Sequence, residues 1–481
     1  MNNGVSVIGK SLLFKSIERF AAKIIGLIVS IVLARILSPD EFGEIAIITV
    51  FINLGIAFVE SGLSSAVVQS KNTDRSDYST IFYVSLVVAV FLTGALVVGA
   101  PFIGKFYNNS NIVLPLQVYS GSLMMSAFHS VQNAKLQREM KFKTVMFTSL
   151  ISTVLSGVVG IVLAYAGAGI WALVAHYLSY TVFSSITILV VDKWHPSLVF
   201  SAKRAKELFS YGWKMLVSGL LCSIYADIRM LIIGKVHSEA DLGYYNRGQQ
   251  FPTVIASTLE ATVHSVIFPV TAKVQDNKAE IKKLIKNTLS IGSLIIMPIM
   301  IGLCAAAEPI IIVLLTDKWL PAVPFMRIIG LGSASIAMVT ANLTAIKSIG
   351  RSDVYMKLEL VRRTVMLAVL AVSVFAFKSV KAIAWGYAIS SWIDVVVISV
   401  PVKRLIGYGL IEQLSDVWKI ILASVLMAGA VLAVGLIAAP EWLLLIVQIL
   451  VGIIVYCLMC MLLKIEAFGQ LVNIIKGKIK K

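Results

Sequence analysis

Charged residues are scarce in this sequence. Only 14% of the 481 residues are Asp, Glu, Lys or Arg, compared with about a quarter in soluble globular proteins. Hydrophobic residues make up 58%, and the mean hydropathy is +0.90. This composition excludes an ordinary soluble domain and predicts an all-α polytopic membrane protein. Acidic residues number 25 against 42 Lys and Arg, and in a membrane protein this excess indicates basic cytoplasmic loops rather than a nucleic-acid-binding surface.

Cysteine and catalytic motifs are also sparse. Two of the four cysteines, Cys457 and Cys460, form a CxxC, but it lies in an apolar run without companion metal ligands. No Walker, H-x-x-E-H or nucleophile-elbow pattern is present. The connections between apolar runs are too short for a soluble catalytic domain. We therefore expect neither an enzyme nor a resident metal or cofactor.

The long apolar runs predict about fourteen transmembrane helices, each long enough to cross a bilayer. They lie at 17–36, 44–66, 80–103, 112–133, 145–166, 169–190, 210–234, 248–272, 286–307, 323–346, 357–377, 381–401, 417–438 and 442–463. With the N-terminus in the cytoplasm, the cytoplasmic tails and loops hold roughly four times as many Lys and Arg as the outer loops. Both termini are thus predicted to be cytoplasmic.

An internal repeat divides the chain. Phe42-Gly43 aligns with Leu242-Gly243, and in the same register Glu60 aligns with Glu260. The predicted parts are an N-lobe of six spans (1–190), a cytoplasmic linker (191–209), a C-lobe of six spans (210–402), and a segment with two further spans and a basic cytoplasmic tail (403–481). Because six is even, the two lobes are parallel repeats, an arrangement that places a substrate site between lobes and permits alternating access.

The sequence around this repeat resembles a known family. ARILSPDEFGEIA and ESGLSSAVVQ in the first half, and QREMKFK after the fourth span, resemble Wzx-type oligosaccharide flippases, particularly the colanic acid and teichuronic acid exporter branch. The resemblance implies membership of the multidrug/oligosaccharidyl-lipid/polysaccharide (MOP) exporter superfamily. It also implies transport of undecaprenyl-diphosphate-linked oligosaccharide repeat units across the bacterial plasma (inner) membrane, for O-antigen, capsule, exopolysaccharide or teichuronic acid. A polysaccharide polymerase and chain-length machinery are expected partners.

Ionisable residues inside spans are costly and so indicate function. Arg19, Lys23, Lys214 and Arg229 are candidates for a cationic cavity that binds the diphosphate, although basic residues near helix ends also extend to headgroups. For Arg362 and Arg363 the headgroup interpretation is preferred. Glu60, Glu260 and Asp394 are candidates for coupling to H⁺ or Na⁺, or for contacts at the lobe interface.

Two other functions remain to be weighed. A cation-coupled multidrug exporter of the same superfamily would need an acidic cavity, whereas the intramembrane charges here are mainly basic. A polymerase or membrane glycosyltransferase would need paired carboxylates on a large loop or cytosolic domain, and neither is present.

Overall fold

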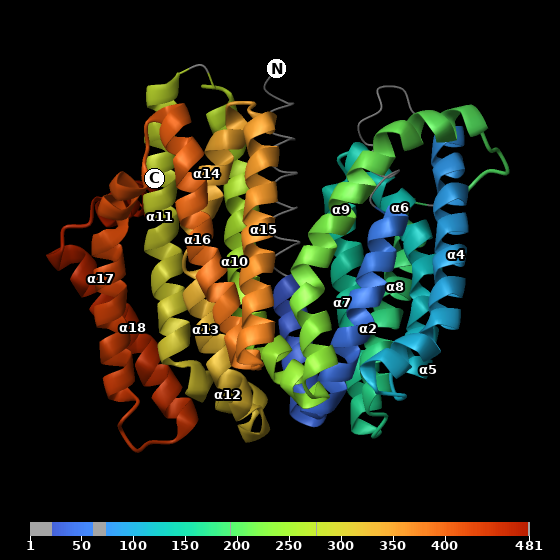
Figure 1. Cartoon of the computed structure of the whole chain (residues 1–481), viewed down its shortest axis with the longest axis horizontal. Coiled ribbons are helices and arrows are strands. Elements are labelled where there is room, and N and C mark those ends of the chain that lie inside the picture. Colours follow the sequence, from blue (N-terminus) through green and yellow to red (C-terminus); the bar gives the residue numbers. More distant parts are fainter. Residues whose placement is uncertain (1–21, 61–73, 193, 276, 480–481) are drawn as a thin grey trace. The chain divides into compact units, whose positions relative to one another are not determined.

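The computed structural model describes residues 22–60, 74–192, 194–275 and 277–479, and every regular element in these ranges is helical (Figure 1). Two compact units divide the chain at Gly243, and each is described separately. The described residues of unit 1 form a helix over residues 22–36 and seven labelled helices. These are α2 (Pro39–Glu60), α4 (Arg75–Tyr107), α5 (Val113–Ser120), α6 (Ser122–Arg138), α7 (Phe142–Tyr165), α8 (Ile170–Asp192) and α9 (Ala202–Val236).

Helix α10 (Glu239–Ala272) begins in unit 1 and continues into unit 2. The remaining elements of unit 2 are α11 (Lys278–Ala305), α12 (Ala307–Leu315), the 3₁₀ helix η1 (Asp317–Ala322), α13 (Val323–Ser333), α14 (Ile336–Ser348), α15 (Ser352–Phe377), α16 (Val380–Ile406), α17 (Leu410–Val434), α18 (Glu441–Leu462) and α19 (Glu466–Ile479).

Twelve segments of the described chain are long and apolar enough to span a membrane, which confirms the polytopic helical class. Two of the fourteen predicted spans are not among them. The predicted span 17–36 begins outside the described residues, and the predicted span 112–133 is divided into α5 and α6 at Gly121. The count of fourteen and the cytoplasmic position of both termini therefore stay predictions.

The internal repeat is visible in local backbone structure. Ser38 and Glu41 form a capping box, in which Ser38 N donates to Glu41 Oε2 at 2.6 Å and Glu41 N donates to Ser38 Oγ at 3.3 Å. Two hundred residues later, Asp241 N donates to Ser238 Oγ at 3.1 Å, and that hydroxyl donates to Asp241 Oδ2 at 2.8 Å. Matching Ser-x-x-acid sequences thus start α2 and α10 in the same way.

A second structural match occurs at a bend in each unit. Helices α5 and α6 meet at Gly121 (φ −58°, ψ −23°), and α13 and α14 meet around Ala334 (φ −61°, ψ −24°). At both places the chain makes tighter i→i−3 bonds, such as Met124 N to Gly121 O and Met338 N to Ser335 O. The two lobes therefore share a broken helix at equivalent positions.

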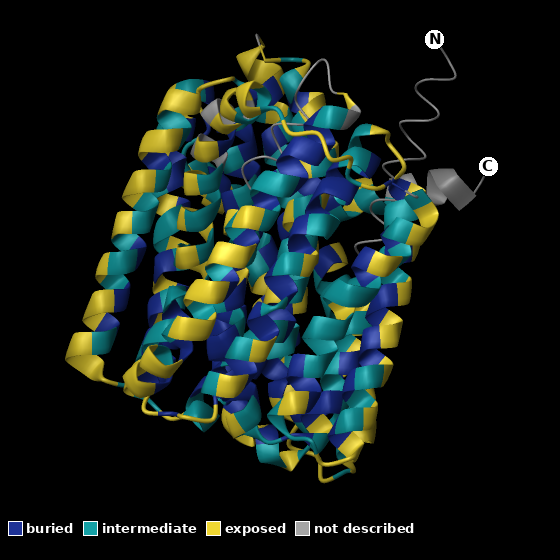
Figure 2. Cartoon of the chain, turned by 90° about the vertical axis from the view of Figure 1, so that its right-hand side faces the viewer, coloured by how far each residue is buried: buried dark blue, intermediate teal, exposed yellow. Residues whose placement is uncertain are grey.

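Helix α9 packs against α2 and α4 and therefore belongs to unit 1. In the sequence repeat, however, the span within α9 is the first span of the second half. The predicted limits of the lobes and linker concern the sequence repeat, and they stay a prediction. The spans of each unit run roughly side by side (Figure 1), and exposed residues follow the outward faces of the helices (Figure 2). Large apolar side chains such as Phe91 and Phe375 lie on these faces, as expected for surfaces that contact lipid.

The C-terminal helices belong to unit 2. Helix α17 packs along α11, with Val417 and Ile420 in the same buried cluster as Ile281 and Ile285. The Lys286 ammonium of α11 lies 2.7 Å from Asp416 Oδ1 of α17, which reinforces this contact. The Asn342 side chain of α14 also donates to Gln413 Oε1 of α17, at 2.8 Å. Helix α18 packs on α17 and α12.

Candidate functional site

The predicted site residues are distributed over both units, and their side chains have different surroundings. Arg19 lies outside the described residues, and Lys214 lies in α9, where its side chain is not described. Lys23 is half-buried at the start of the helix over residues 22–36, and Arg229 is buried in α9 with 9% of its surface exposed. Glu60 is half-buried at the end of α2, Glu260 is exposed on α10, and Asp394 is half-buried on α16.

An ion network links α15 and α16 inside unit 2. Arg362 Nη2 donates to Asp394 Oδ2 at 2.7 Å, and Arg362 Nη1 donates to the carboxylate of Glu359 one turn earlier. Arg363 Nε also contacts Glu359, at 3.3 Å. Two cations and two carboxylates therefore compensate each other, which lowers the cost of placing charge at this depth.

Arg362 corrects one expectation from the sequence. Its side chain is only 12% exposed and is oriented toward Asp394 on the neighbouring helix, so it does not extend to the headgroups. Because Arg362 is five residues beyond 357, where the predicted span begins, it lies about 7–8 Å inside that span, a quarter of the thickness of the hydrocarbon core. Its buried Nε has no hydrogen-bond partner among the described residues.

In unit 1, polar side chains meet at mid-span between α2 and α9. The side chain of Asn53, on an exposed position of α2, hydrogen-bonds the half-buried Asp227 carboxylate. Arg229 follows two residues later on α9. An exposed amide and a carboxylate in the middle of apolar spans are not expected to face lipid, because each would lose its hydration there. This face of unit 1 therefore borders water or polar groups, whereas Arg229 is buried on a different side of α9.

At the other end of these helices, α2 and α10 cross at glycine. A Cβ atom on Gly43 would overlap the backbone carbonyl of Glu239, and a Cβ on Gly243 would overlap that of Pro39. Only glycine permits so close an approach. The two segments that align in the sequence repeat are thus in direct contact.

An amide beside this crossing bridges two acids. Asn109 Nδ2 donates to Glu44 Oε1 at 2.9 Å and to Glu239 Oε1 at 3.1 Å, and Asn111 also donates to Glu44. The carboxylate of Glu44 is almost completely buried. These residues were missed by the sequence analysis. The signal available was the polar run Asn108-Asn109-Ser110-Asn111 between two apolar segments, which gave no indication of its partner on α2.

The remaining predicted residues have less defined surroundings. Residues 61–73, which follow Glu60, lie outside the described ranges, and Glu260 belongs to the other unit. The two interpretations of these acids, ion coupling and a lobe contact, therefore both stay open. No cluster of three His, Cys, Asp or Glu suited to a metal ion occurs in the described part of the chain.

The family model described as polysaccharide biosynthesis protein matches residues 32–324. The chain is 24% identical over 354 residues to the succinoglycan biosynthesis transport protein ExoT of Rhizobium meliloti (strain 1021), covering 74% of this chain and 72% of ExoT. It is also 24% identical over 396 residues to the teichuronic acid biosynthesis protein TuaB of Bacillus subtilis (strain 168), covering 80% and 79%. The resemblance predicted from the sequence motifs is thereby confirmed.

A solved structure shares the fold. The inward closed conformation of the lipid II flippase MurJ superposes with a TM-score of 0.78 at 16% identity, covering 94% of this chain and 98% of MurJ. At this identity the match concerns the fold, and it confirms the expected two-lobed architecture.

Proposed function

Because the chain belongs to the polysaccharide biosynthesis protein family, we propose that it is a flippase for polyprenyl-diphosphate-linked oligosaccharide repeat units. It is a multi-pass protein of the bacterial inner membrane, with twelve apolar spans in the described residues. The observation that supports transport most directly is the polar face of unit 1 at mid-span, where Asn53 and Asp227 interrupt apolar helices. Such a face is needed where a hydrophilic headgroup crosses the membrane, and a membrane anchor has no use for it.

The diphosphate determines which residues bind the headgroup. It carries at least two negative charges, and guanidinium and ammonium groups compensate these by charge-assisted hydrogen bonds. We assign this role to Arg229, Lys23, Arg19 and Lys214. Arg362 is a weaker candidate because Glu359 and Asp394 already neutralise it, so an anion would have to displace a carboxylate.

Alternating access requires a contact that opens and closes. The crossing of α2 and α10 at Gly43 and Gly243 is suited to this role, because the two backbones approach closely without interlocking side chains. Asn109 reinforces the closed arrangement through Glu44 and Glu239. We propose that this crossing separates when the outer side of the transporter opens.

Coupling to H⁺ or Na⁺ is assigned to Glu60 and Glu260 in this proposal. Asp394 is less suited, because its carboxylate already bonds the Arg362 guanidinium at 2.7 Å. A polysaccharide polymerase and chain-length machinery would act on the exported units, and their association with this chain is part of the proposal.

The proposal is tested in the producing strain by deleting the gene. We expect polyprenyl-linked repeat units to accumulate in the cytoplasmic leaflet and surface glycan to be lost, both measured by lipid extraction and mass spectrometry. Unchanged glycan and intermediate levels would refute the flippase assignment. Reduced tolerance to cationic drugs with normal glycan would instead support the multidrug exporter.

A matched pair of variants tests the headgroup site in the complemented strain. Arg229→Gln should lower export about tenfold or more, as expected for loss of one charge-assisted hydrogen bond. The control Arg351→Gln removes an arginine that is half-exposed and paired with Asp353 near the start of α15, and it should leave export unchanged. Equal export by both variants at equal expression would exclude Arg229 from the site.

A further inference from the structure

The segment between α8 and α9 is firmly attached to unit 1. Trp194, which is 7% exposed, makes aromatic contacts with Tyr78 and Phe82 of α4 and with Phe128 of α6, at centroid distances of 6.3–6.4 Å. Together with Ile81 and Val131 these residues form a buried cluster. Trp194 therefore anchors the beginning of the segment by apolar burial.

Polar bonds attach the rest of the segment. Ser197 N donates to Ser79 Oγ at 2.9 Å, and Ser201 N donates to Thr80 Oγ1 at 3.1 Å. Arg204 then makes two bonds of 2.9 Å to the Asp77 carboxylate. These bonds raise the pKa of the Arg204 guanidinium, with a smaller contribution from Glu207. The backbone from 194 to 204 is thus held at four successive points.

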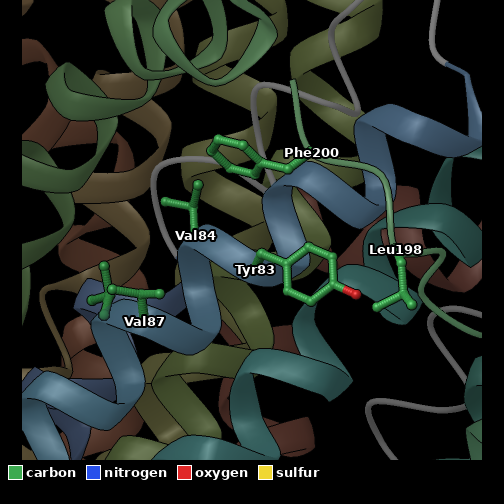
Figure 3. A pocket seen from close by; sticks show the side chains of 6 residues that line it. Tyr83, Val84, Val87, Leu198 and Phe200 are labelled. Carbon is green, nitrogen blue, oxygen red and sulfur yellow. The ribbon is translucent and has the colours of Figure 1, made fainter. Parts of the chain in front are cut away.

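Between these points three apolar side chains remain uncovered. Leu198 is 98% exposed, Phe200 is 56% exposed, and Val199 lies between them at 50%. Leu198 and Phe200 border a cavity of about 550 Å³ whose other lining residues, Tyr83, Val84, Val87 and Val88, come from α4. Figure 3 shows the phenol of Tyr83 and the side chains of Leu198 and Phe200 around this space. A rigid backbone that presents apolar groups around an apolar cavity is arranged for a hydrophobic ligand.

The position of the cavity identifies its surroundings. The exposed apolar face of α4 runs from Val87 to Phe106, a distance of about 29 Å at 1.5 Å per residue, which equals the thickness of the hydrocarbon core. Val87 therefore marks one boundary of the bilayer. The cavity lies at this boundary and continues the lipid-facing surface of α4, on the cytoplasmic side in the predicted topology.

Basic residues follow the cavity along the chain. Lys203 and Lys206 are exposed on the first two turns of α9, one helical turn apart, and neither has an ion pair with a carboxylate of the described residues. Arg204 between them is already paired. Phe209 and Trp213 are exposed farther along the same helix. Figure 1 shows these first turns running across the end of unit 1 before α9 descends. Apolar and basic side chains together are typical of a helix at the membrane surface.

We propose that this site binds an anionic phospholipid of the cytoplasmic leaflet. One acyl chain occupies the cavity between α4 and residues 198–200, and the phosphate headgroup lies at Lys203 and Lys206. The proposal is independent of the transported substrate, because the cavity is on the lipid-facing side of α4 and contains none of the predicted diphosphate ligands. Its function is to hold the linker and the start of α9 at the membrane surface.

Photocrosslinking tests the occupant directly. The full-length protein with benzoylphenylalanine in place of Phe200 is reconstituted in nanodiscs of phosphatidylethanolamine and phosphatidylglycerol, and crosslinked lipids are identified by mass spectrometry. The matched control carries the same group in place of Phe102, which is 72% exposed on the lipid face of α4. Because each lysine favours an anionic headgroup about fivefold, phosphatidylglycerol should be enriched at least severalfold at position 200 relative to position 102.

Charge variants complete the test. Lys203→Gln with Lys206→Gln should abolish the enrichment at position 200 while lipid crosslinking itself persists, and Lys105→Gln, at the other end of α4, should leave it intact. Equal lipid composition at positions 200 and 102 would overturn the proposal. So would enrichment that survives the double substitution. The same crosslinking in native membranes distinguishes other occupants. If a polyprenyl lipid dominated the adducts at position 200, the proposal would be overturned and the cavity would be a site for the transported substrate. Adducts only to protein would also overturn it and would indicate a protein partner.

Discussion

The ion pair between Arg362 and Asp394 is expected to stabilise unit 2 measurably. Replacing Asp394 by Asn removes one carboxylate and leaves the Arg362 guanidinium with Glu359 alone. Breaking a fully buried ion pair costs about 3–5 kcal/mol. Asp394 is 21% exposed and Arg362 keeps one partner, so we expect a loss of about 2 kcal/mol in the free energy of unfolding.

The measurement is a double-mutant cycle on purified protein in one detergent, with unfolding followed by denaturant titration. Asp394→Asn and Arg362→Gln are measured separately and together, and the double variant should recover part of the loss because no uncompensated charge remains. The control is Asp353→Asn on α15, the helix that carries Arg362. Its partner Arg351 lies at a similar distance of 2.8 Å, but both side chains are about half exposed, so we expect little change.

Two outcomes would refute this reasoning. If Asp394→Asn were no more destabilising than Asp353→Asn, burial would not make the ion pair between Arg362 and Asp394 contribute more to the free energy of unfolding than an exposed pair. If the two single losses simply added in the double variant, Arg362 and Asp394 would not interact. A stable Asp394→Asn variant that had lost transport would indicate that Asp394 takes part in coupling to H⁺ or Na⁺.

Other contacts give shorter tests. Gly43→Ala should reduce surface glycan strongly, because the new methyl group overlaps the carbonyl of Glu239. The control Gly94→Ala on α4 has open space around the new methyl group and should leave surface glycan unchanged. Normal export by Gly43→Ala at normal expression would contradict the close crossing of α2 and α10. Asp77→Asn should lower the free energy of unfolding by about 1–2 kcal/mol, since Asp77 is buried but Arg204 is about one-third exposed. Limited proteolysis should then cut near residue 200 faster than in the parent protein, and an unchanged rate would show that this ion pair does not hold the linker.

The twelve apolar helices of the described residues were predictable from the sequence, because hydropathy is a property of one segment in contact with lipid. The orientation indicated by the basic loops stays a prediction. The repeat was also readable, since Ser38 and Ser238 each precede an acid by three residues and form local caps. The bends at Gly121 and Ala334 were missed, because their 3₁₀-type bonds leave no change in hydropathy.

Contacts between helices were decided by the tertiary structure alone. Arg362 and Asp394 are 32 residues apart, and their pairing depends on how α15 and α16 are rotated toward each other. In a membrane that rotation is poorly encoded by hydropathy, because lipid-facing and protein-facing surfaces are both apolar. The same reason explains why the partner of Glu44 and the apolar cavity beside residues 198–200 emerged only when the helices were assembled. The sequence determined which segments enter the membrane, and the packing determined which of their charges meet.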